Sequence, residues 1–299
     1  LKQSLGGNEI TKVSGIINGT TNYILSRMDK EGVNYAEVLK DAQELGYAES
    51  DPAADVEGSD AADKIAILSG LAFGGAINRA NIPTTGINLL EGIDVNYARK
   101  LGYGIKLLAI SEKGENQSKS EDSQPLSVWV EPTLVPEDNP LAGVNGVNNA
   151  ILVEGNPIGQ VMFFGPGAGS GPTASAVVAD ILNIAGIQSM SGEKTNNLDP
   201  LLSAKSWRSC HVAEKKQITK KNYIRLIAED SPGVIGEIGN IFGKKKISIE
   251  SIVQFDVTDE EAEIVVITHK IQQGQLEEAL LEIKNLSQVK RIAATMGCL

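Results

Sequence analysis

The 299-residue sequence predicts an α+β fold of two successive domains. In the first part of the chain, segments with helical periodicity precede a series of alternating segments that are typical of strands in one mixed sheet. The end of the chain repeats a shorter alternation of strands and helices. With 41% hydrophobic and 22% charged residues, the chain is long enough for about two globular domains. We expect a first domain at 1–207, a linker at 208–221 and a second domain at 222–299.

The first domain is expected to begin with helices and to end with a sheet. The chain starts in what looks like the end of a helix, and a strand and turn follow. The expected elements are a strand and turn at 9–19, helices at 20–30, 35–45 and 60–73, strands at 103–111, 124–132, 150–154 and 159–164, and a helix at 173–185. The polar stretch 111–124 is expected to form an exposed hairpin loop.

The second domain has a recognisable order of elements. Strand-like segments occur at 222–229, 247–256, 262–270 and 289–295, and helical segments at 231–246 and 276–286. Their order along the chain is β-α-β-β-α-β, which is typical of a ferredoxin-like fold.

The segment from 41 to 64 carries most of the chemical information. Eight acidic residues lie between positions 41 and 63, with no Lys or Arg among them. Gly46 and Gly58 interrupt the helical pattern, so the carboxylates are expected on a bent loop. Asp60 and Lys64 are four residues apart and share one helix face, where the acid can orient the ammonium group. The alternatives are a simple helical ion pair or an oxygen-lined site for a divalent cation.

This pattern resembles the signature of homoserine dehydrogenases. The matching positions are Ala42, Gly46, Tyr47, Ala48, Asp51, Pro52, Asp55, Val56, Gly58, Asp60 and Lys64. The resemblance continues in GIINGTTNYIL at 15–25 and in FGPGAGSGPTA at 164–174, so it covers most of the first domain.

The resemblance implies hydride transfer between a nicotinamide and homoserine, which gives L-aspartate 4-semialdehyde. Lys64 would exchange the proton at the substrate oxygen, and Asp60 would hold Lys64 in place. Because the neighbouring acids favour a charged lysine, we expect Lys64 mainly to donate a proton during reduction.

The resemblance also implies a substrate pocket. Glu49 and Asp55 would bind the substrate ammonium group, and Tyr47, Gly19 and Thr20 would line the pocket.

The cofactor, NAD or NADP, is expected to be bound mainly outside this chain. The sequence contains no strand followed by a G-x-G-x-x-G turn, a helix and an acid roughly 20 residues later. It begins at Leu1 without a methionine and reads as a fragment that would not turn over alone. The resemblance implies that Gly169 approaches the nicotinamide from this chain. An equally simple interpretation makes GPGAGSG a loop before a helix.

Composition excludes several other functions. The net charge of -11 argues against nucleic acid and anionic membranes as partners. The longest uncharged stretch, 155–179, is rich in Gly and Pro and is not a membrane span, and no signal peptide is recognisable. Cys210 and Cys298 have no metal-ligand spacing with His211 or His269, so we predict no metal site, reduced thiols and a cytoplasmic location.

The segment DSPGVIGEIGNIF at 230–242 resembles the start of ACT domains, which bind amino acids. The resemblance places an effector at the first helix of this domain, near Asp230, Gly233, Val234 and Ile235, and suggests threonine. Free backbone N–H groups at a helix start favour a carboxylate. A homodimer or higher homo-oligomer is expected. The alternative is a dimerisation module without a ligand.

The complete prediction is a mixed-sheet substrate and dimerisation domain followed by a ferredoxin-like ACT domain. Its function would be that of an NAD(P)-dependent homoserine dehydrogenase in threonine and methionine biosynthesis. The alternative is a non-catalytic protein that senses amino acids. The enzyme is favoured because a sensor has no need of Lys64 and Asp60 in register.

Overall fold

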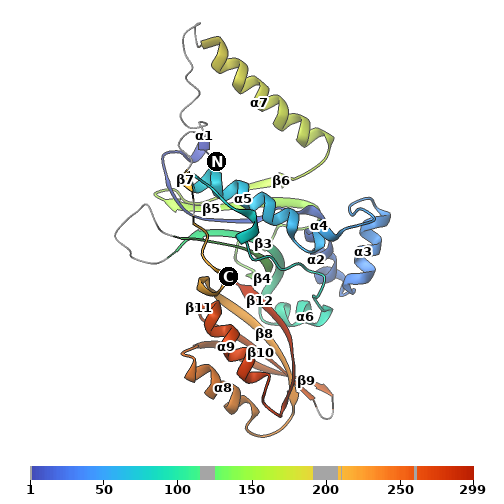
Figure 1. The fold of residues 1–299 in the computed structure, drawn as a ribbon. Coiled ribbons are helices and arrows are strands. Elements are labelled where there is room, and N and C mark those ends of the chain that lie inside the picture. The colour runs from blue at the N-terminus through green and yellow to red at the C-terminus, as the bar shows by residue number, and fades with distance from the viewer. Residues whose placement is uncertain (1, 115–124, 191–207, 210, 259–260) are drawn as a thin grey trace.

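A computed structural model describes residues 2–114, 125–190, 208–209, 211–258 and 261–299. The predicted α+β architecture with a mixed sheet is confirmed (Figure 1). Within these residues, one ten-stranded sheet runs through the molecule in the order β6-β5-β1-β3-β4-β12-β8-β10-β9, with β11 paired to β8. The expected loop at 111–124 lies mostly outside the described residues, apart from the end of β3 and Gly114.

The first domain contains the predicted helices and strands, with small shifts at their ends. Its elements are α1 (Lys2–Leu5), β1 (Glu9–Ile16), α2 (Gly19–Glu31), α3 (Tyr35–Glu44), α4 (Ala53–Val56), α5 (Ser59–Phe73), β2 (Gly75–Ala76), η1 (Arg79–Asn81), α6 (Gly92–Lys100), β3 (Tyr103–Lys113), β4 (Leu126–Pro136), β5 (Asn148–Asn156), β6 (Gly159–Pro166) and α7 (Ser170–Met190). In the stretch expected to be a linker, the structure has β7 (Arg208–Ser209) and η4 (Lys215–Gln217). Strands β3, β4, β5 and β6 lie in one sheet, as predicted, and β1 lies in the same sheet between β5 and β3.

Glycines set the limits of the helices around the acid-rich loop. Gly46 (φ 76°) follows α3, and Gly58 (φ 85°) and Gly74 (φ 81°) flank α5. This left-handed backbone is accessible to glycine at little cost. A Cβ atom on Gly58 would also lie 3.1 Å from Cγ2 of Thr84. The predicted interruptions are therefore confirmed, and they direct α4 and α5 toward the start of α2.

The second domain has the predicted ferredoxin-like topology. Its elements are β8 (Thr219–Glu229), α8 (Val234–Lys244), β9 (Ile249–Thr258), β10 (Glu261–Thr268), β11 (Ile271–Gln272), α9 (Gln273–Ile283) and β12 (Val289–Cys298). The strands β12-β8-β10-β9 are antiparallel, and α8 and α9 lie together on one side of them (Figure 1). Ile238, Phe242 and Ile283 are fully buried between these layers.

The two domains share a sheet and a core. β12 pairs in parallel with β4 through Gly297 and Thr133, and a Cβ atom on Gly297 would meet Oε1 of Glu131 at 2.5 Å. One buried cluster includes Val13 from β1 and also Met296 from β12. β8 begins at Thr219, within the stretch expected to be a linker, so the end of that stretch is part of the sheet.

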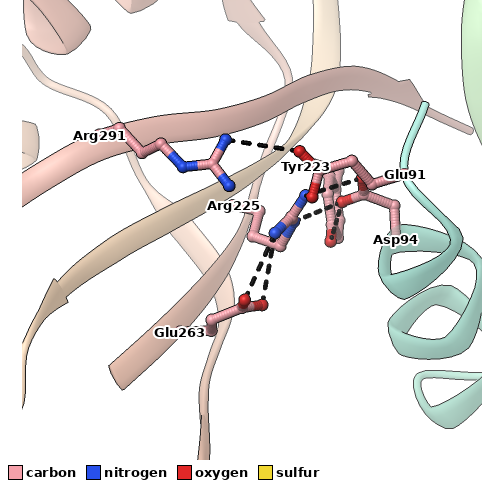
Figure 2. A network of polar contacts seen from close by, with 6 residues as sticks. All are labelled: Glu91, Asp94, Tyr223, Arg225, Glu263 and Arg291. Carbon is pink, nitrogen blue, oxygen red and sulfur yellow. Dashed lines mark hydrogen bonds and ion pairs between the residues drawn. The ribbon is translucent and has the colours of Figure 1, made fainter. Parts of the chain in front are cut away.

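Helix α6, which the sequence did not predict, connects the domains through a buried ionic cluster (Figure 2). Arg225 on β8 has a side chain only 1% exposed, and its Nε donates to Oδ1 of Asp94 at 2.7 Å. Its Nη2 donates to Glu91 at 2.8 Å, and its Nη1 lies 3.5 Å from Glu263. The Tyr223 hydroxyl donates to Asp94 at 3.0 Å. The hydrogen bond from Arg225 lowers the pKa of the Glu91 carboxyl.

Helix α7 projects from the sheet in Figure 1. None of the described helices combines the length and apolar composition needed to span a membrane.

Candidate functional site

The site begins at the start of α2, where Asn18 caps the helix. Its Oδ1 accepts hydrogen bonds from the backbone N–H of Thr21 at 2.9 Å and from the Thr21 hydroxyl at 3.0 Å. Asn is a favoured capping residue because its side-chain oxygen satisfies a free N–H group of the first turn. The cap fixes the turn that contains Gly19 and Thr20 against the rest of the site.

Lys64 and Asp60 form the predicted pair on α5. Nζ of Lys64 donates to Oδ2 of Asp60 at 2.7 Å and to the carbonyl oxygen of Ile17 at 3.1 Å. The Lys64 side chain is 46% exposed, so a ligand can reach its ammonium group. The lysine is therefore oriented by two acceptors while staying accessible.

Asp55 is brought to the same place by α4. Nδ2 of Asn18 donates to Oδ1 of Asp55 at 2.7 Å and to Oδ2 of Asp60 at 2.9 Å. The amide nitrogen of Asn18 thus lies between the two carboxylates, whereas a divalent cation held there would require oxygen ligands. Among the described residues, no group of three or more His, Cys, Asp or Glu side chains is placed to hold a metal ion.

The loop after α3 meets the start of α2 at Tyr47. The Thr20 hydroxyl donates to the carbonyl oxygen of Tyr47 at 2.7 Å, and the Tyr47 ring lies 4.9 Å from that of Tyr23. Gly19 is closely packed, since a Cβ atom there would lie 2.8 Å from the carbonyl oxygen of Val147. Three of the five expected pocket residues are therefore adjacent to one another.

Glu49 is the predicted site residue whose carboxylate is least fixed. The residue is exposed, and its carbonyl oxygen accepts a hydrogen bond from Gln43 at 3.1 Å. Its place two residues beyond Tyr47 keeps it on the same loop as the other predicted pocket residues.

An open cavity of about 450 Å³ lies beside Lys64, between α5 and the strands β5 and β6. It is mostly apolar and is lined by Ile17, Lys64, Ile67, Leu68, Asn149, Ala150, Ile151, Phe163, Phe164, Gly165, Pro166 and Gly167. Its size and apolar walls with a few polar groups are typical of sites for small organic ligands.

One amide in the wall of this cavity has an acceptor that is not satisfied, and a ligand carboxamide such as that of nicotinamide carries a matching donor. Oδ1 of Asn149 is buried and has no hydrogen-bond partner. A Cβ atom on Gly167 would collide with the carboxamide of Asn149 as it is placed here, so glycine allows this close approach. Gly169 (φ 112°) lies two residues further on and is not among the lining residues, so its predicted contact with the cofactor stays a prediction.

The predicted effector residues lie around the start of α8. Gly233 (φ 97°) precedes the helix, and no side chain caps its first turn. Oδ1 of Asp230 accepts a hydrogen bond from Gln254 at 2.9 Å. Val234 is 3% exposed and can offer only its backbone, whereas Ile235 is 40% exposed.

Sequence reasoning missed Asn18 and Asn149. The stretch Asn18-Gly19-Thr20-Thr21 has a capping residue before a helix, which was the available signal for Asn18. Nothing in the sequence indicated that Asn149, at the start of a strand, would face the loop containing Gly167.

Comparison with known proteins shows which families this chain resembles. The family model described as homoserine dehydrogenase matches residues 1–182, and that of the ACT domain matches residues 222–288. The homoserine dehydrogenase of Synechocystis sp. is 52% identical over 100% of this chain and 68% of its own length. That of Bacillus subtilis is 36% identical over 99% of this chain and 65% of its own length.

The crystal structure of a homoserine dehydrogenase from Thiobacillus denitrificans has a TM-score of 0.91 and 36% identity, over 100% of this chain and 66% of that chain. This chain spans about two thirds of the length of these relatives. The comparisons place it among oxidoreductases that carry an ACT domain. The chain belongs to the homoserine dehydrogenase family.

Proposed function

We propose that this chain carries the substrate site of an NAD(P)-dependent enzyme that interconverts L-homoserine and L-aspartate 4-semialdehyde in threonine and methionine biosynthesis. The observation that carries the proposal is the position of Lys64, which is held by Asp60 at 2.7 Å and lines an apolar cavity. A bound nicotinamide would supply or accept the hydride. Lys64 would protonate the substrate oxygen during reduction and take the proton back during oxidation.

The acidic loop would recognise the ammonium group of the substrate. Asp55 lies 2.7 Å from the amide that also binds Asp60, so its position is fixed before substrate arrives. Glu49 would complete the site from the exposed loop. Tyr47, Gly19 and Thr20 would shape the pocket around the rest of the substrate, since Thr20 and Tyr47 are already hydrogen-bonded.

The cofactor would be held mainly outside these 299 residues, with Gly169 and the cavity beside Lys64 contributing only the nicotinamide end. The cavity offers apolar walls and the Asn149 carboxamide, but the sequence has no dinucleotide-binding turn. A hyperthermophilic archaeal homoserine dehydrogenase mutant, 28% identical with a TM-score of 0.50, is in complex with NADPH. The choice between NAD and NADP would be made by residues that this chain does not contain.

The ACT domain would bind an amino-acid effector, threonine in our proposal, at Asp230 and the free start of α8. The protein would form a homodimer or a higher homo-oligomer. We also propose a cytoplasmic location, which fits the free, buried thiol of Cys298.

Replacement of Lys64 tests the enzyme directly. The assay enzyme is a fusion protein. Its first part is the segment of the Synechocystis relative that has no counterpart in this chain, and the 299 residues follow it. In it, Lys64→Ala should lower kcat for homoserine oxidation by a factor of about 10² to 10⁴, because a general acid is lost. Lys40→Ala, whose side chain is 76% exposed on α3, is the matched control and should leave kcat unchanged.

Reduced-nicotinamide absorbance measures the rate, and calorimetry measures homoserine binding. Turnover of Lys64→Ala at the rate of the unaltered enzyme would remove the proposed role of Lys64. An assay enzyme that binds amino acids without any turnover would favour the alternative of an amino-acid sensor.

A further inference from the structure

Asn18 uses its carboxamide in two directions at once. Its oxygen caps α2 by accepting from Thr21, while its Nδ2 donates to Asp55 at 2.7 Å and to Asp60 at 2.9 Å. The residue is 6% exposed. Capping alone requires the oxygen only, and Asp or Ser would supply it equally well. The amide nitrogen is therefore an additional feature that a capping role does not explain.

We propose that Asn18 is a positioning residue for the reaction. Its carboxamide connects Asp55, the carboxylate proposed to bind the substrate ammonium group, to Asp60, the carboxylate that orients Lys64. The inference rests on the proposed function. Asp55 comes from α4 and Asp60 from α5, and they meet at the two hydrogens of one amide nitrogen. Without these donors, two like charges would face each other and tend to separate.

The same amide fixes the acceptor that Lys64 uses. Oδ2 of Asp60 receives both Nδ2 of Asn18 at 2.9 Å and Nζ of Lys64 at 2.7 Å. A shift of Asp60 would therefore move the ammonium group away from the substrate oxygen. Loss of the amide should affect substrate affinity through Asp55 and the proton-transfer step through Lys64.

Two substitutions separate this role from helix capping. Asn18→Ser keeps a capping oxygen and removes both donors without adding charge. Asn18→Asp also keeps the cap, but it places a third carboxylate against Asp55 and Asp60. Asn34→Asp is the matched control, because Asn34 precedes α3 and makes no side-chain capping hydrogen bond.

In the assay enzyme, Asn18→Ser should lower kcat/KM for homoserine by about tenfold or more, because two hydrogen bonds to charged groups are lost. We expect KM to rise through the loss of the contact with Asp55, and kcat to fall through the displacement of Asp60 and Lys64. In Asn18→Asp, the acid limb of the pH profile of kcat/KM should also move up by about one unit or more, because three adjacent carboxylates retain a proton more readily than two. The charged groups that face the carboxamide are Asp55, Asp60 and Lys64.

The folded fraction of each variant, measured by circular dichroism during thermal unfolding, corrects the rates for any loss of structure. A normal pH profile in Asn18→Asp, together with kinetics in Asn18→Ser that match those of Asn34→Asp, would overturn the inference. Calorimetric titration with homoserine gives a second readout. If the unaltered assay enzyme binds homoserine without turnover, the proposed function fails. The role of Asn18 is tested independently by the Kd for homoserine, and an unchanged Kd in Asn18→Ser would overturn it.

Discussion

Lys106 shows how a single buried charge supports the loop next to the site. It lies on β3, is 4% exposed, and its Nζ donates to the carbonyl oxygen of Val144 at 2.6 Å and to Asn145 at 2.9 Å. A third contact, to Asn22 on α2, is 3.4 Å long. The lysine thus ties the turn before β5 to the sheet and to the helix that begins at the site. Desolvation by burial lowers its pKa to about 8, although the charge of Asp29 opposes this shift.

This shift predicts a pH-dependent contribution to stability. Above about pH 8 the folded protein holds Lys106 neutral, while the unfolded chain keeps the proton up to the ordinary value of 10.5. The unfolded state then binds more protons, so the free energy of unfolding rises with pH across this window. Relative to Lys106→Met, the unaltered chain should gain up to about 3 kcal/mol between pH 8 and 10.5. Urea unfolding of both proteins across this range measures the difference, and parallel curves would contradict the prediction.

At the same scale, sequence reasoning identified charged residues better than amides. Asp55, Asp60 and Lys64 stood out because their charges and spacing are unusual, and the structure places all three in contact with Asn18 or with each other. The role of Asn18 depends on contacts with residues about 40 positions away, which no local pattern reports. An asparagine before a helix indicates only a cap.

At the scale of elements, the long periodic segments were predicted well and α6 was missed. The helices with a continuous apolar face and the alternating strands were found, with ends that moved by a few residues. Helix α6 is short, and its sequence GIDVNYARK places Asp94 at a fully buried position. A buried aspartate in a predicted helix makes sense only once Arg225, from the other domain, lies against it.

The cluster around Arg225 predicts how strongly α6 is fixed to the second domain. Arg225→Met should lower the free energy of unfolding by about 3–5 kcal/mol, because it leaves Asp94 and Glu263 buried without their cation. Arg291→Met is the matched control. Arg291 also contacts Glu91, but its side chain is 54% exposed, so its replacement should lower the free energy of unfolding by less than about 1 kcal/mol.

Chemical unfolding monitored by far-ultraviolet circular dichroism measures both variants. Adding Asp94→Asn to Arg225→Met should recover part of the loss, since it removes one uncompensated buried charge. Equal losses in the free energy of unfolding for Arg225→Met and Arg291→Met would contradict the prediction that the buried arginine contributes more to stability than the exposed one.

At the scale of the whole molecule, the ACT domain is continuous with the first domain. The parallel pairing of β12 with β4 carries one sheet across both, and Tyr223, Val265 and Met296 share a core with residues of β1 and α5. The sequence predicted two modules in the correct order. It did not predict their fusion, because the pairing of distant strands depends on register and packing that a single sequence does not display.

This continuity determines how effector binding should appear in the 299-residue chain. If threonine binds at the start of α8, it stabilises only the folded state, and the shared core should make both domains unfold in one transition. At a concentration a hundred times Kd, the free energy of unfolding should rise by about 2.7 kcal/mol. Differential scanning calorimetry of the whole chain, with and without threonine, measures this as a higher melting temperature.

Asp230 provides the decisive variant for this effect. Its carboxylate lies next to the uncapped start of α8 and accepts a hydrogen bond from Gln254. In our proposal it would receive the ammonium group of the effector, and the N–H groups at the helix start would receive the carboxylate. Asp230→Ala should therefore abolish the shift in melting temperature. Glu278→Ala, which removes an exposed acid on α9, should keep it. If the chain stays folded and dimeric by sedimentation, yet threonine produces neither heat nor a shift in melting, the domain serves assembly rather than threonine binding.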